Sequence, residues 1–582
     1  MIIRLVNRTI SSLILITTIS FANIVHSQTS YIDYQSPFHS TISEGAMVAS
    51  QNHLSSEIGI EIIKKGGNAV DAAVAVGFSL AVTLPRAGNL GGGGFMLIYM
   101  KDRDEILAID YRSQSPEGLT TDQIFGVNLP DEYKKANRDI VRYGYKASTV
   151  PGTVSGLILA HSQFGKLPLE VVMRPAIEQA REGVNVSYDL EQAIASAPQL
   201  SWDPESKRIY FHEGKPLKRG EVMKRPDLAN TMNQISMNGL KGFYDGEVAE
   251  KIASSMAING GEITTDDLKK YRARFTQPIG VNYRGNKVYT HGPPSGGGIV
   301  LLTALKVLEY FDLGKIGSNS ATSYHLIAEA LRRGHNNRSH HVGDPSFYSV
   351  PYDQLMSNKR IKSFAKSISL KEASLAKEVM PLSVLQESKN TTHYSIIDSE
   401  GNAVSNTYTL GYSFGSGVTI PGTGILMNNQ MNNFAYQYGN KSIKGRAASP
   451  GNKYAPGKRP MSTMAPTIVF DENDKLLLIT GSPGGKLIPA AILRLLTGVI
   501  DFNLNIGNAT MLPRISKDWP YSGLNYETNI SSDSINILKK MGHKVEPSKT
   551  MGSTQSIHVV NDIKHGYSDL RRPNAGVSYI EK

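Results

Sequence analysis

The pattern of the chain changes at the Asn390–Thr391 bond, and this change constrains the fold more than any other feature. Before the bond, apolar residues recur mostly at helical spacing; after it, short apolar runs alternate around Gly- and Asn-containing turns, as in strands. A polar run, 386–390, leads directly into a strand-like segment, 394–398. The sequence therefore predicts a helix-rich part and a sheet-rich part, joined by an exposed loop at which the chain can be cut.

Thr391 lies where this loop enters the strand. A threonine hydroxyl is a weak nucleophile unless a nearby group takes its proton, and a cut just before Thr391 would supply that group as a new α-amine. An α-amine has an ordinary pKa of about 7.7 to 8, so it acts as a base near neutral pH without a histidine or a metal. The hairpin pattern taken alone favours an ordinary strand. A cut between Asn390 and Thr391 is therefore a hypothesis that needs support from the rest of the chain.

The composition restricts the chemistry further. None of the 582 residues is cysteine, which removes disulfides, thiolate metal sites and cysteine nucleophiles. Apolar residues make up 40% and charged residues 19% of the chain, as in ordinary globular proteins. The net charge of +11 comes without long basic runs, so scattered solvated lysines explain it better than nucleic-acid binding. Any nucleophile must be an oxygen or an amine.

The first residues predict export. Arg4 and Arg8 precede an apolar run, 10–25, and Ser27 precedes Gln28. This order is typical of a secretory signal peptide, with cleavage near Ser27. The alternative is a membrane anchor, but the run is short for crossing a bilayer. We expect residues 1–27 to be removed and the protein to reach the periplasm or the medium.

Hydrophobic periodicity predicts the main elements. The segment 70–83 is apolar on almost all sides, so we expect a buried helix that begins after Asn68. Helices are expected at 54–65, 70–83, 157–185, in several pieces over 222–270, at 299–311, at 326–333 and, weakly, at 361–380. Strands are expected at 45–50, 96–99, 106–112, 283–291, 395–398 and 403–409.

Two motifs that suggest ligands have simpler explanations. The four glycines at 91–94 resemble a phosphate cradle, but a strand follows them and no Lys-Ser or Lys-Thr does. His335, His340 and His341 lack a carboxylate at helical offset, so surface or capping histidines explain them better than a metal site. We predict no metal and no cofactor.

Six motifs together resemble the γ-glutamyltransferase family, also called γ-glutamyl transpeptidase or glutathione hydrolase, over about 45–571. They are GGNAVDAA at 66–73, GNLGGGGFM at 88–96, PGTV at 151–154, TTHYS at 391–395, GSPGG at 481–485 and MGSTQS at 551–556. The resemblance implies an α+β fold of the N-terminal-nucleophile hydrolase type, a four-layer αββα sandwich. It also implies one precursor that cuts itself into a large subunit, 28–390, and a small subunit, 391–582, which stay together as a heterodimer.

The resemblance also implies roles for individual residues. Thr391 would be the nucleophile that carries the γ-glutamyl group of a small donor such as glutathione, and would pass it to water, an amino acid or a peptide. The other implied residues are Thr409, whose hydroxyl steadies Thr391; Gly484 and Gly485, whose N–H groups face the oxyanion; Arg112, Ser462 and Thr463 for the donor α-carboxylate; and Gln430 and Asn433 for its α-ammonium.

The ammonium side departs from the family pattern. Gly411 stands where an asparagine is usual and Asn433 where an aspartate is usual, so a buried ammonium would lose its charged partner. The alternative is therefore an acylase of the same fold that acts on glutaryl amides, like cephalosporin acylases, or on poly-γ-glutamate. A binding relative without activity is disfavoured because Thr391, Thr409 and the glycine pair are retained.

Two further segments resemble family features. The segment 436–456, with Tyr436, Tyr438 and Tyr454, has the length of a lid over the donor site, which would favour small donors over polymers; the alternative is a flexible surface loop. The segment 568–571 resembles a Ser-Asp-Pro-Arg motif in which Leu570 replaces the proline. We interpret that replacement as a small structural divergence.

Overall fold

The structure is a computed structural model that describes residues 36–121, 124, 140–375, 379, 390–438, 441–444, 450–519 and 523–581. The predicted signal peptide, 1–27, and residues 380–389, which include most of the predicted polar loop before Thr391, lie outside these residues. Residues 40–582 form one compact unit. Within the described part of the chain, no helix is both long and apolar enough to cross a membrane.

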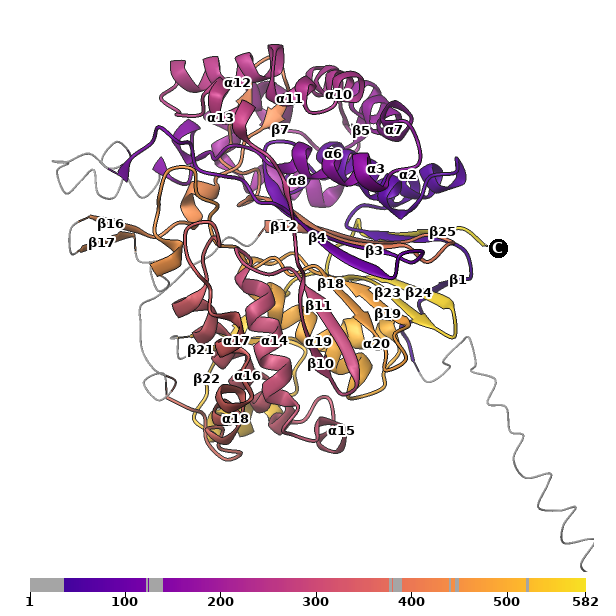
Figure 1. Cartoon of the computed structure of the whole chain (residues 1–582), viewed down its shortest axis with the longest axis vertical. Helices are drawn as coiled ribbons and strands as arrows, with labels where there is room; N and C mark the ends of the chain where they lie inside the picture. The colour runs from indigo at the N-terminus through magenta and orange to yellow at the C-terminus, as the bar shows by residue number, and fades with distance from the viewer. Residues whose placement is uncertain are drawn as a thin grey trace, which may run out of the picture. The chain divides into compact units, whose positions relative to one another are not determined.

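Two antiparallel sheets lie face to face between two layers of helices (Figure 1). The first sheet has the strand order β25-β2-β12-β13-β3-β4-β9, and the second has the order β1-β24-β23-β19-β18-β11-β10. Their bounds are β25 Gly576–Tyr579, β2 Met47–Ser50, β12 Asn390–Ile397, β13 Ala403–Gly411, β3 Gly93–Met100, β4 Glu105–Tyr111 and β9 Arg274–Thr276; then β1 Thr41–Ser43, β24 Ile563–Ser568, β23 Gln555–Val560, β19 Leu476–Thr480, β18 Thr467–Phe470, β11 Asn286–Thr290 and β10 Ile279–Tyr283.

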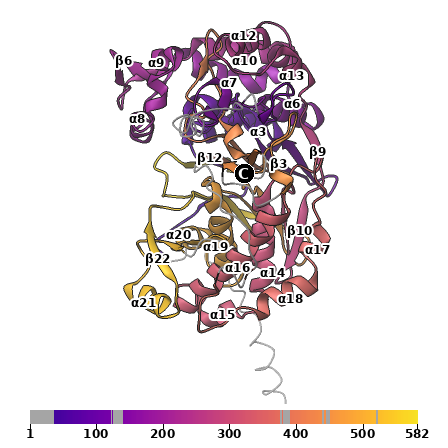
Figure 2. The same cartoon turned by 90° about the vertical axis from the view of Figure 1, so that its left-hand side faces the viewer.

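Helices cover the outer face of each sheet, and both views show them on opposite sides (Figures 1 and 2). On the first sheet lie α2 His53–Lys64, α3 Ala69–Thr83, α6 Thr153–Phe164, α7 Leu169–Glu182, α8 Tyr188–Ala195, α10 Pro226–Asn238, α11 Lys241–Tyr244, α12 Glu247–Ile258 and α13 Thr265–Lys270. On the second lie α14 Gly296–Leu308, α15 Leu313–Ile316, α16 Ala321–His341, α17 Tyr352–Leu355, α18 Asn358–Lys366, α19 Ile488–Ile500 and α20 Ile506–Met511. The predicted α+β sandwich is confirmed.

The remaining elements are small. The helices α9 Pro204–Tyr210 and α21 Ser532–Lys540 are short, and a third sheet consists of β20 Ile515–Lys517, β21 Gly523–Glu527 and β22 Lys544–Ser548. Two-stranded ribbons pair β5 Val184–Asn185 with β8 Val222–Met223, β6 Phe211–His212 with β7 Lys215–Pro216, β14 Thr419–Ile420 with β15 Ile425–Leu426, and β16 Tyr436–Tyr438 with β17 Lys441–Lys444.

The helix α3 is the centre of the core on the first sheet. Asn68 accepts hydrogen bonds from Val70 N and Asp71 N, and the Asp71 carboxylate accepts one from Asn68 N, which satisfies the first turn. Every residue of α3 is buried, as the sequence predicts. Tyr394 of β12 donates to Ala73 O (2.8 Å), so one face of the strand that follows Thr391 packs against this helix.

Some boundaries differ from the sequence-based predictions. The helical pattern over 157–185 forms two helices, α6 and α7, because Gly165 and Pro168 separate them. The expected strand 283–291 covers only the last residue of β10, a turn at which Arg284 takes a positive φ of 53°, and then β11. The helix α16 runs on to His341, so the prediction that His335 lies on the surface is wrong: its side chain is buried.

Candidate active site

An irregularity in strand pairing surrounds Thr391. Asn390 lies opposite Gly411, and Thr392 lies opposite Tyr408, so Thr409 and Leu410 together face Thr391 alone. An extra residue of this kind bends its strand and re-aims the neighbouring side chains, which is common next to active sites.

The other face of β12 fixes the direction of Thr391. Side chains alternate along a strand, so Thr391 shares a face with His393 and Ser395. Ser395 Oγ donates to Gln555 O of the second sheet (2.9 Å), which places this face between the two sheets. Thr391 therefore lies at the end of the space between the sheets.

A small cavity lies in front of Thr391. Its lining encloses about 290 Å³ of empty space, including the part open to solvent, and consists of Arg112, Thr391, Thr409, Gly411, Asn433, Ser462, Thr463, Met464 and Gly485. Of the predicted site residues, Gly484 and Gln430 are outside this lining. A larger hollow of about 1140 Å³ lies beside Trp202, but the cavity at Thr391 is the one that brings together most of the predicted site residues.

Arg112 presents an unsatisfied cation to this cavity. Its side chain is fully buried, and its Nε donates to Pro460 O (3.1 Å). Within the described part of the chain, Nη1 and Nη2 have no hydrogen-bond partner. Burial lowers the pKa of Arg112 to about 9, although the Asp110 carboxylate acts in the opposite direction, so keeping this guanidinium charged costs free energy. An anionic group in the cavity would relieve that cost.

The Asp110 carboxylate, close to Arg112 in sequence, pairs with two other arginines. Asp110 pairs with Arg459 (2.8 Å) and Arg274 (2.9 Å) and accepts a hydrogen bond from the Arg112 backbone N–H. Burial alone would raise the pKa of Asp110, but Arg459 and Arg274 lower it below its ordinary value. The Arg112 guanidinium is thus positioned through its backbone and left open towards the cavity.

Ser462 and Thr463 are held next to Arg112 by the start of α14. Ser462 N donates to Pro294 O (3.0 Å), and Gly296 N donates to Ser462 O (2.7 Å). A Cβ at Gly297 would lie 2.1 Å from Thr463 O, so only glycine allows this approach. The glycines at the start of α14 therefore serve the placement of the two hydroxyl residues.

The residues predicted to bind the donor α-ammonium offer fewer free groups to the cavity than those predicted to bind its α-carboxylate. Gly411 has φ of 105°, and a Cβ there would lie 2.2 Å from Asn429 Oδ1. Gln430 is turned away: its Oε1 accepts from Ser113, and its Nε2 donates to Thr409 O (2.8 Å). Asn433 Oδ1 is buried and has no partner among the described residues, so it is a free acceptor at the cavity.

The turn 482–486 closes the cavity beside Thr391. Gly484 and Gly485 have φ of 132° and 57°, and the chain then enters α19 through one turn of 3₁₀ helix, Gly485–Leu487. Backbone N–H groups at the beginning of a helix attract negative charge. Gly485 contacts the cavity directly, whereas Gly484 packs against Gly552.

The family follows from comparison with known proteins. The model of the family described as Gamma-glutamyltranspeptidase matches residues 55–579. The chain belongs to this family. It is 41% identical to the glutathione hydrolase proenzyme of Escherichia coli (strain K12), over 92% of each chain.

Two solved structures are similar to the chain in fold. The crystal structure of cephalosporin acylase from Bacillus halodurans is similar with a TM-score of 0.82 and 27% identity, over 95% of this chain and 99% of that chain. The gamma-glutamyltranspeptidase of Helicobacter pylori is 36% identical with a TM-score of 0.53, over 56% of this chain and 93% of that one. The family resemblance, the N-terminal-nucleophile hydrolase fold and the assignment as a γ-glutamyltransferase-type enzyme are confirmed. The proenzyme names of the relatives fit a processed enzyme that acts on small molecules.

Within this family member, sequence reasoning missed a buried amide residue that organises the site. Asn428 Oδ1 accepts from Thr149 N, Thr149 Oγ1 and Gln430 N, and its Nδ2 donates to Gly91 O (2.7 Å). A Cβ at Gly92 would lie 2.2 Å from Thr409 O, so the glycine run serves the packing around Thr409. The polar run 428–430 could have indicated this residue, but Thr149 and Gly91, with which Asn428 bonds, are far away in the sequence.

His393 is close to Thr391 in sequence but is structural. Its Nδ1 bonds Thr407 Oγ1 (2.8 Å), and its Nε2 bonds Ser395 Oγ (3.0 Å). Burial lowers its pKa to about 3, so it is neutral at pH 7. A Cβ at Gly481 would lie 2.4 Å from this ring, which accounts for the glycine there.

Buried histidines predict a stability that falls in mild acid. Burial lowers the pKa values of His393 and His543 to about 3 and of His335 to about 4. The unfolded chain binds protons below about pH 6.5, so each histidine destabilises the fold by up to about 1.4 kcal/mol per pH unit between that pH and its folded pKa. We expect the urea midpoint of the uncut Thr391→Ala chain to be constant from pH 8 to 7 and to fall from pH 6.5 to 5. The urea midpoint should fall less steeply with pH when His393→Gln is added to this chain. An equal slope in both chains would contradict the conclusion that His393 is buried in its neutral form.

A second histidine cluster has the residues of a metal site but is already satisfied. His325, Glu329 and His543 lie together, and none of the histidines singled out in the sequence belongs to this group. Lys517 Nζ donates to Glu329 (3.0 Å) and to His543 Nδ1 (2.9 Å), while His325 and His543 bond each other (2.8 Å). The lysine ammonium supplies the positive charge, so these residues do not suit a metal ion.

Two of the three tyrosines in the predicted lid segment, Tyr436 and Tyr454, pack against each other. Tyr436 and Tyr454 stack with ring centroids 5.4 Å apart, and the Tyr436 hydroxyl donates to Met431 O (2.7 Å). Neither contributes to the cavity lining. Residues 439–440 and 445–449, and the Tyr438 side chain, lie outside the described residues.

Proposed function

We propose that the chain cuts itself between Asn390 and Thr391 and then acts as an exported γ-glutamyltransferase and glutathione hydrolase. Its donors would be γ-glutamyl amides such as glutathione, and its acceptors would be water, amino acids or peptides. The observation that carries the proposal is that Nη1 and Nη2 of Arg112 have no hydrogen-bond partner among the described residues and that Arg112 lines the same cavity as Thr391. A donor with an anionic end and an amide carbonyl fits that pair.

Self-cleavage begins with the Thr391 hydroxyl. Its Oγ attacks the Asn390 carbonyl carbon, the peptide C–N bond breaks, and the acyl group moves to Oγ as an ester while the nitrogen takes up a proton. Water then hydrolyses the ester, which leaves a carboxylate at Asn390 and a free α-amine on Thr391. Residues 28–390 and 391–582 become the large and small subunits, with 1–27 removed as a signal peptide.

The cut enzyme transfers an acyl group in two steps. Arg112, Ser462 and Thr463 bind the donor α-carboxylate, and the new α-amine takes the proton of Thr391 Oγ as it attacks the γ-carbonyl. The N–H groups of Gly484 and Gly485 stabilise the oxyanion. The leaving amine takes the proton from the α-ammonium, and water or an acceptor amine then repeats the attack on the ester. Thr409 Oγ1 accepts a hydrogen bond from Gly411 N (2.9 Å) and donates to Gly411 O (3.4 Å), so the Gly411 backbone holds the hydroxyl that would steady Thr391.

The lining of the cavity also supports a second candidate. It contains one cation and no carboxylate, Gly411 contributes no side chain, and Asn433 offers a neutral oxygen. A glutaryl amide has the carboxylate that Arg112 requires and no α-ammonium. An acylase for glutaryl-type amides, as in cephalosporin acylases, or for poly-γ-glutamate, is therefore the alternative. Gln430, bonded to Thr409 O, positions the catalytic threonines in both cases.

A comparison of two donors tests which candidate holds. We expect the purified, cut enzyme to turn over γ-glutamyl anilide faster than glutaryl anilide, because Asn433 Oδ1 accepts a hydrogen bond from the α-ammonium. Asn433→Leu should reduce that preference about tenfold and leave glutaryl turnover little changed. Equal or faster turnover of glutaryl anilide by the wild-type enzyme would establish the acylase instead.

A further inference from the structure

The turn 482–486 needs support from outside itself. Its two central glycines both have positive φ and carry no side chain that could hold them. Gly485 nevertheless lines the cavity at Thr391, where an oxyanion-binding N–H must keep its position to within a fraction of an ångström.

The first support acts on the beginning of the turn. Ser553 N donates to Ser482 Oγ (3.0 Å), and a Cβ at Gly484 would lie 3.3 Å from Gly552 Cα. Residues 551–554 are themselves fixed at both ends, because Arg514 Nη1 donates to Met551 O (2.6 Å) and Thr554 N donates to Asp569 (3.0 Å). The beginning of the turn is thus held in place, through residues 551–554, by a buried network of ion pairs.

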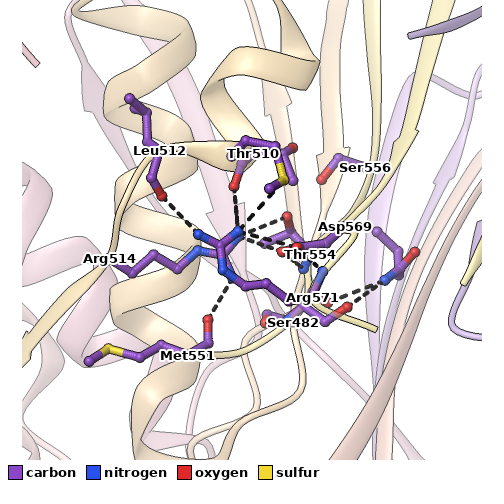
Figure 3. Close-up of polar contacts among 12 residues, drawn as sticks. Ser482, Thr510, Leu512, Arg514, Met551, Thr554, Ser556, Asp569 and Arg571 are labelled. Carbon is purple, nitrogen blue, oxygen red and sulfur yellow. Dashed lines mark hydrogen bonds and ion pairs between the residues drawn. The ribbon is translucent and has the colours of Figure 1, made fainter. Parts of the chain in front are cut away.

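Figure 3 shows this network, in which Arg514 and Arg571 converge on Asp569 next to Thr554. Arg514 pairs with Asp569 at 2.6 Å, and Arg571 pairs with it at 3.2 Å. Leu570, the residue that departs from the family motif, is 63% exposed and takes no part. The motif residues that matter for the turn are therefore retained.

The second support acts on the end of the turn. Lys486 follows Gly485 directly, and its Nζ donates to Asp518 Oδ2 (2.5 Å). Asp518 is only 6% exposed, and its Oδ1 lies 3.3 Å from His335 Nε2 of α16. Asp518 ends the same segment, 514–518, that begins with Arg514. One short segment therefore supports the turn at both ends.

The charges favour Lys486 as the main partner of Asp518. Burial lowers the pKa of His335 to about 4, so His335 is neutral at pH 7. Burial alone would raise the pKa of Asp518, but His335 and Lys486 together lower it below its ordinary value. Asp518 is thus a carboxylate at neutral pH, which pairs directly with the Lys486 ammonium and also feels the charge of Arg338.

We propose that Asp518 is a positioning residue: by holding Lys486 it fixes the turn 482–486 and, through it, the oxyanion-binding N–H of Gly485. The expected effect of Asp518 on catalysis rests on the proposed function, because that function assigns the oxyanion-binding role to Gly485. The tether itself is a property of the fold. Loss of Asp518 should slow the acyl-transfer step and leave donor binding at Arg112 unchanged.

The test compares Asp518→Asn, Lys486→Met and the double variant with the wild-type enzyme on the better of the two anilides. We expect both single variants to lower kcat at least about tenfold, with KM changed less than about twofold, since only an interaction in the transition state is lost. The kcat of the double variant should be no lower than that of the less active single variant, because both substitutions remove the same ion pair. Amide hydrogen exchange over 482–488 should be faster in all three.

The matched control is Asp474→Asn, which breaks an ion pair of the same length, 2.5 Å to Lys287, at an exposed site. It should change neither kcat nor exchange at 482–488. Unchanged exchange in Asp518→Asn, or faster exchange with unchanged kcat, would overturn the proposal; so would losses that add in the double variant. Lys486 is partly exposed, so Lys486→Met still decides the matter if Asp518→Asn fails to fold. A wild-type enzyme that turns over neither anilide would refute the proposed function, while exchange would still decide the tether.

Discussion

We expect the Thr391→Ala variant to purify as a single uncut chain and to turn over neither anilide. The wild-type protein, in contrast, should give one fragment that begins near Gln28 and one that begins at Thr391. The reason is that one hydroxyl group performs both the attack on Asn390 and the attack on the donor. We expect the rate of donor turnover to fall at least about 1,000-fold, as for other lost nucleophiles. Intact mass analysis and initial rates measure the two effects.

Thr392→Val is the matched control for this prediction. Thr392 is fully buried beside Thr391, and its hydroxyl has no hydrogen-bond partner among the described residues, so valine removes no bond. This variant should cut itself and turn over donors at close to the wild-type rates. A Thr391→Ala chain that still splits at the same bond would refute self-cleavage by Thr391.

Arg112→Met is expected to have the second-largest effect, but on donor binding alone. Losing two charge-assisted hydrogen bonds to the donor carboxylate should cost about 3 kcal/mol, which is about a 100-fold loss in kcat/KM. Most of the loss should appear in KM, because the carboxylate binds equally in the ground state and the transition state. Self-cleavage should proceed normally, since Asn390 is already covalently in place.

Two controls separate the charge of Arg112 from its packing. Arg112→Lys keeps a cation but not the planar fork, so its kcat/KM should fall less, by about tenfold. A donor whose α-carboxylate is converted to an amide should be a poor substrate for the wild-type enzyme and should lose nothing further in Arg112→Met. An equal loss with that neutral donor would show that Arg112 acts through the structure and not through the carboxylate.

The sequence by itself determined the elements whose signals are local. The apolar run of α3 with its Asn68 cap, the hairpin of β12 and β13, and the strands β3 and β4 follow from periodicity and turn residues within short windows. Thr391 at the mouth of a strand was visible for the same reason. Boundaries were less certain where a turn interrupted one continuous pattern, as between α6 and α7.

Only the tertiary structure decided how the site residues are used. The open guanidinium of Arg112, the inward turn of Gln430, the absence of space at Gly411 and the tether from Asp518 to Lys486 all depend on segments far apart in the chain. A side chain's hydrogen-bonding needs are set by its own chemistry, but the partner that meets them is set by packing. The sequence could therefore propose a nucleophile, whereas only the packed chain separates the groups left open for a donor from those already satisfied.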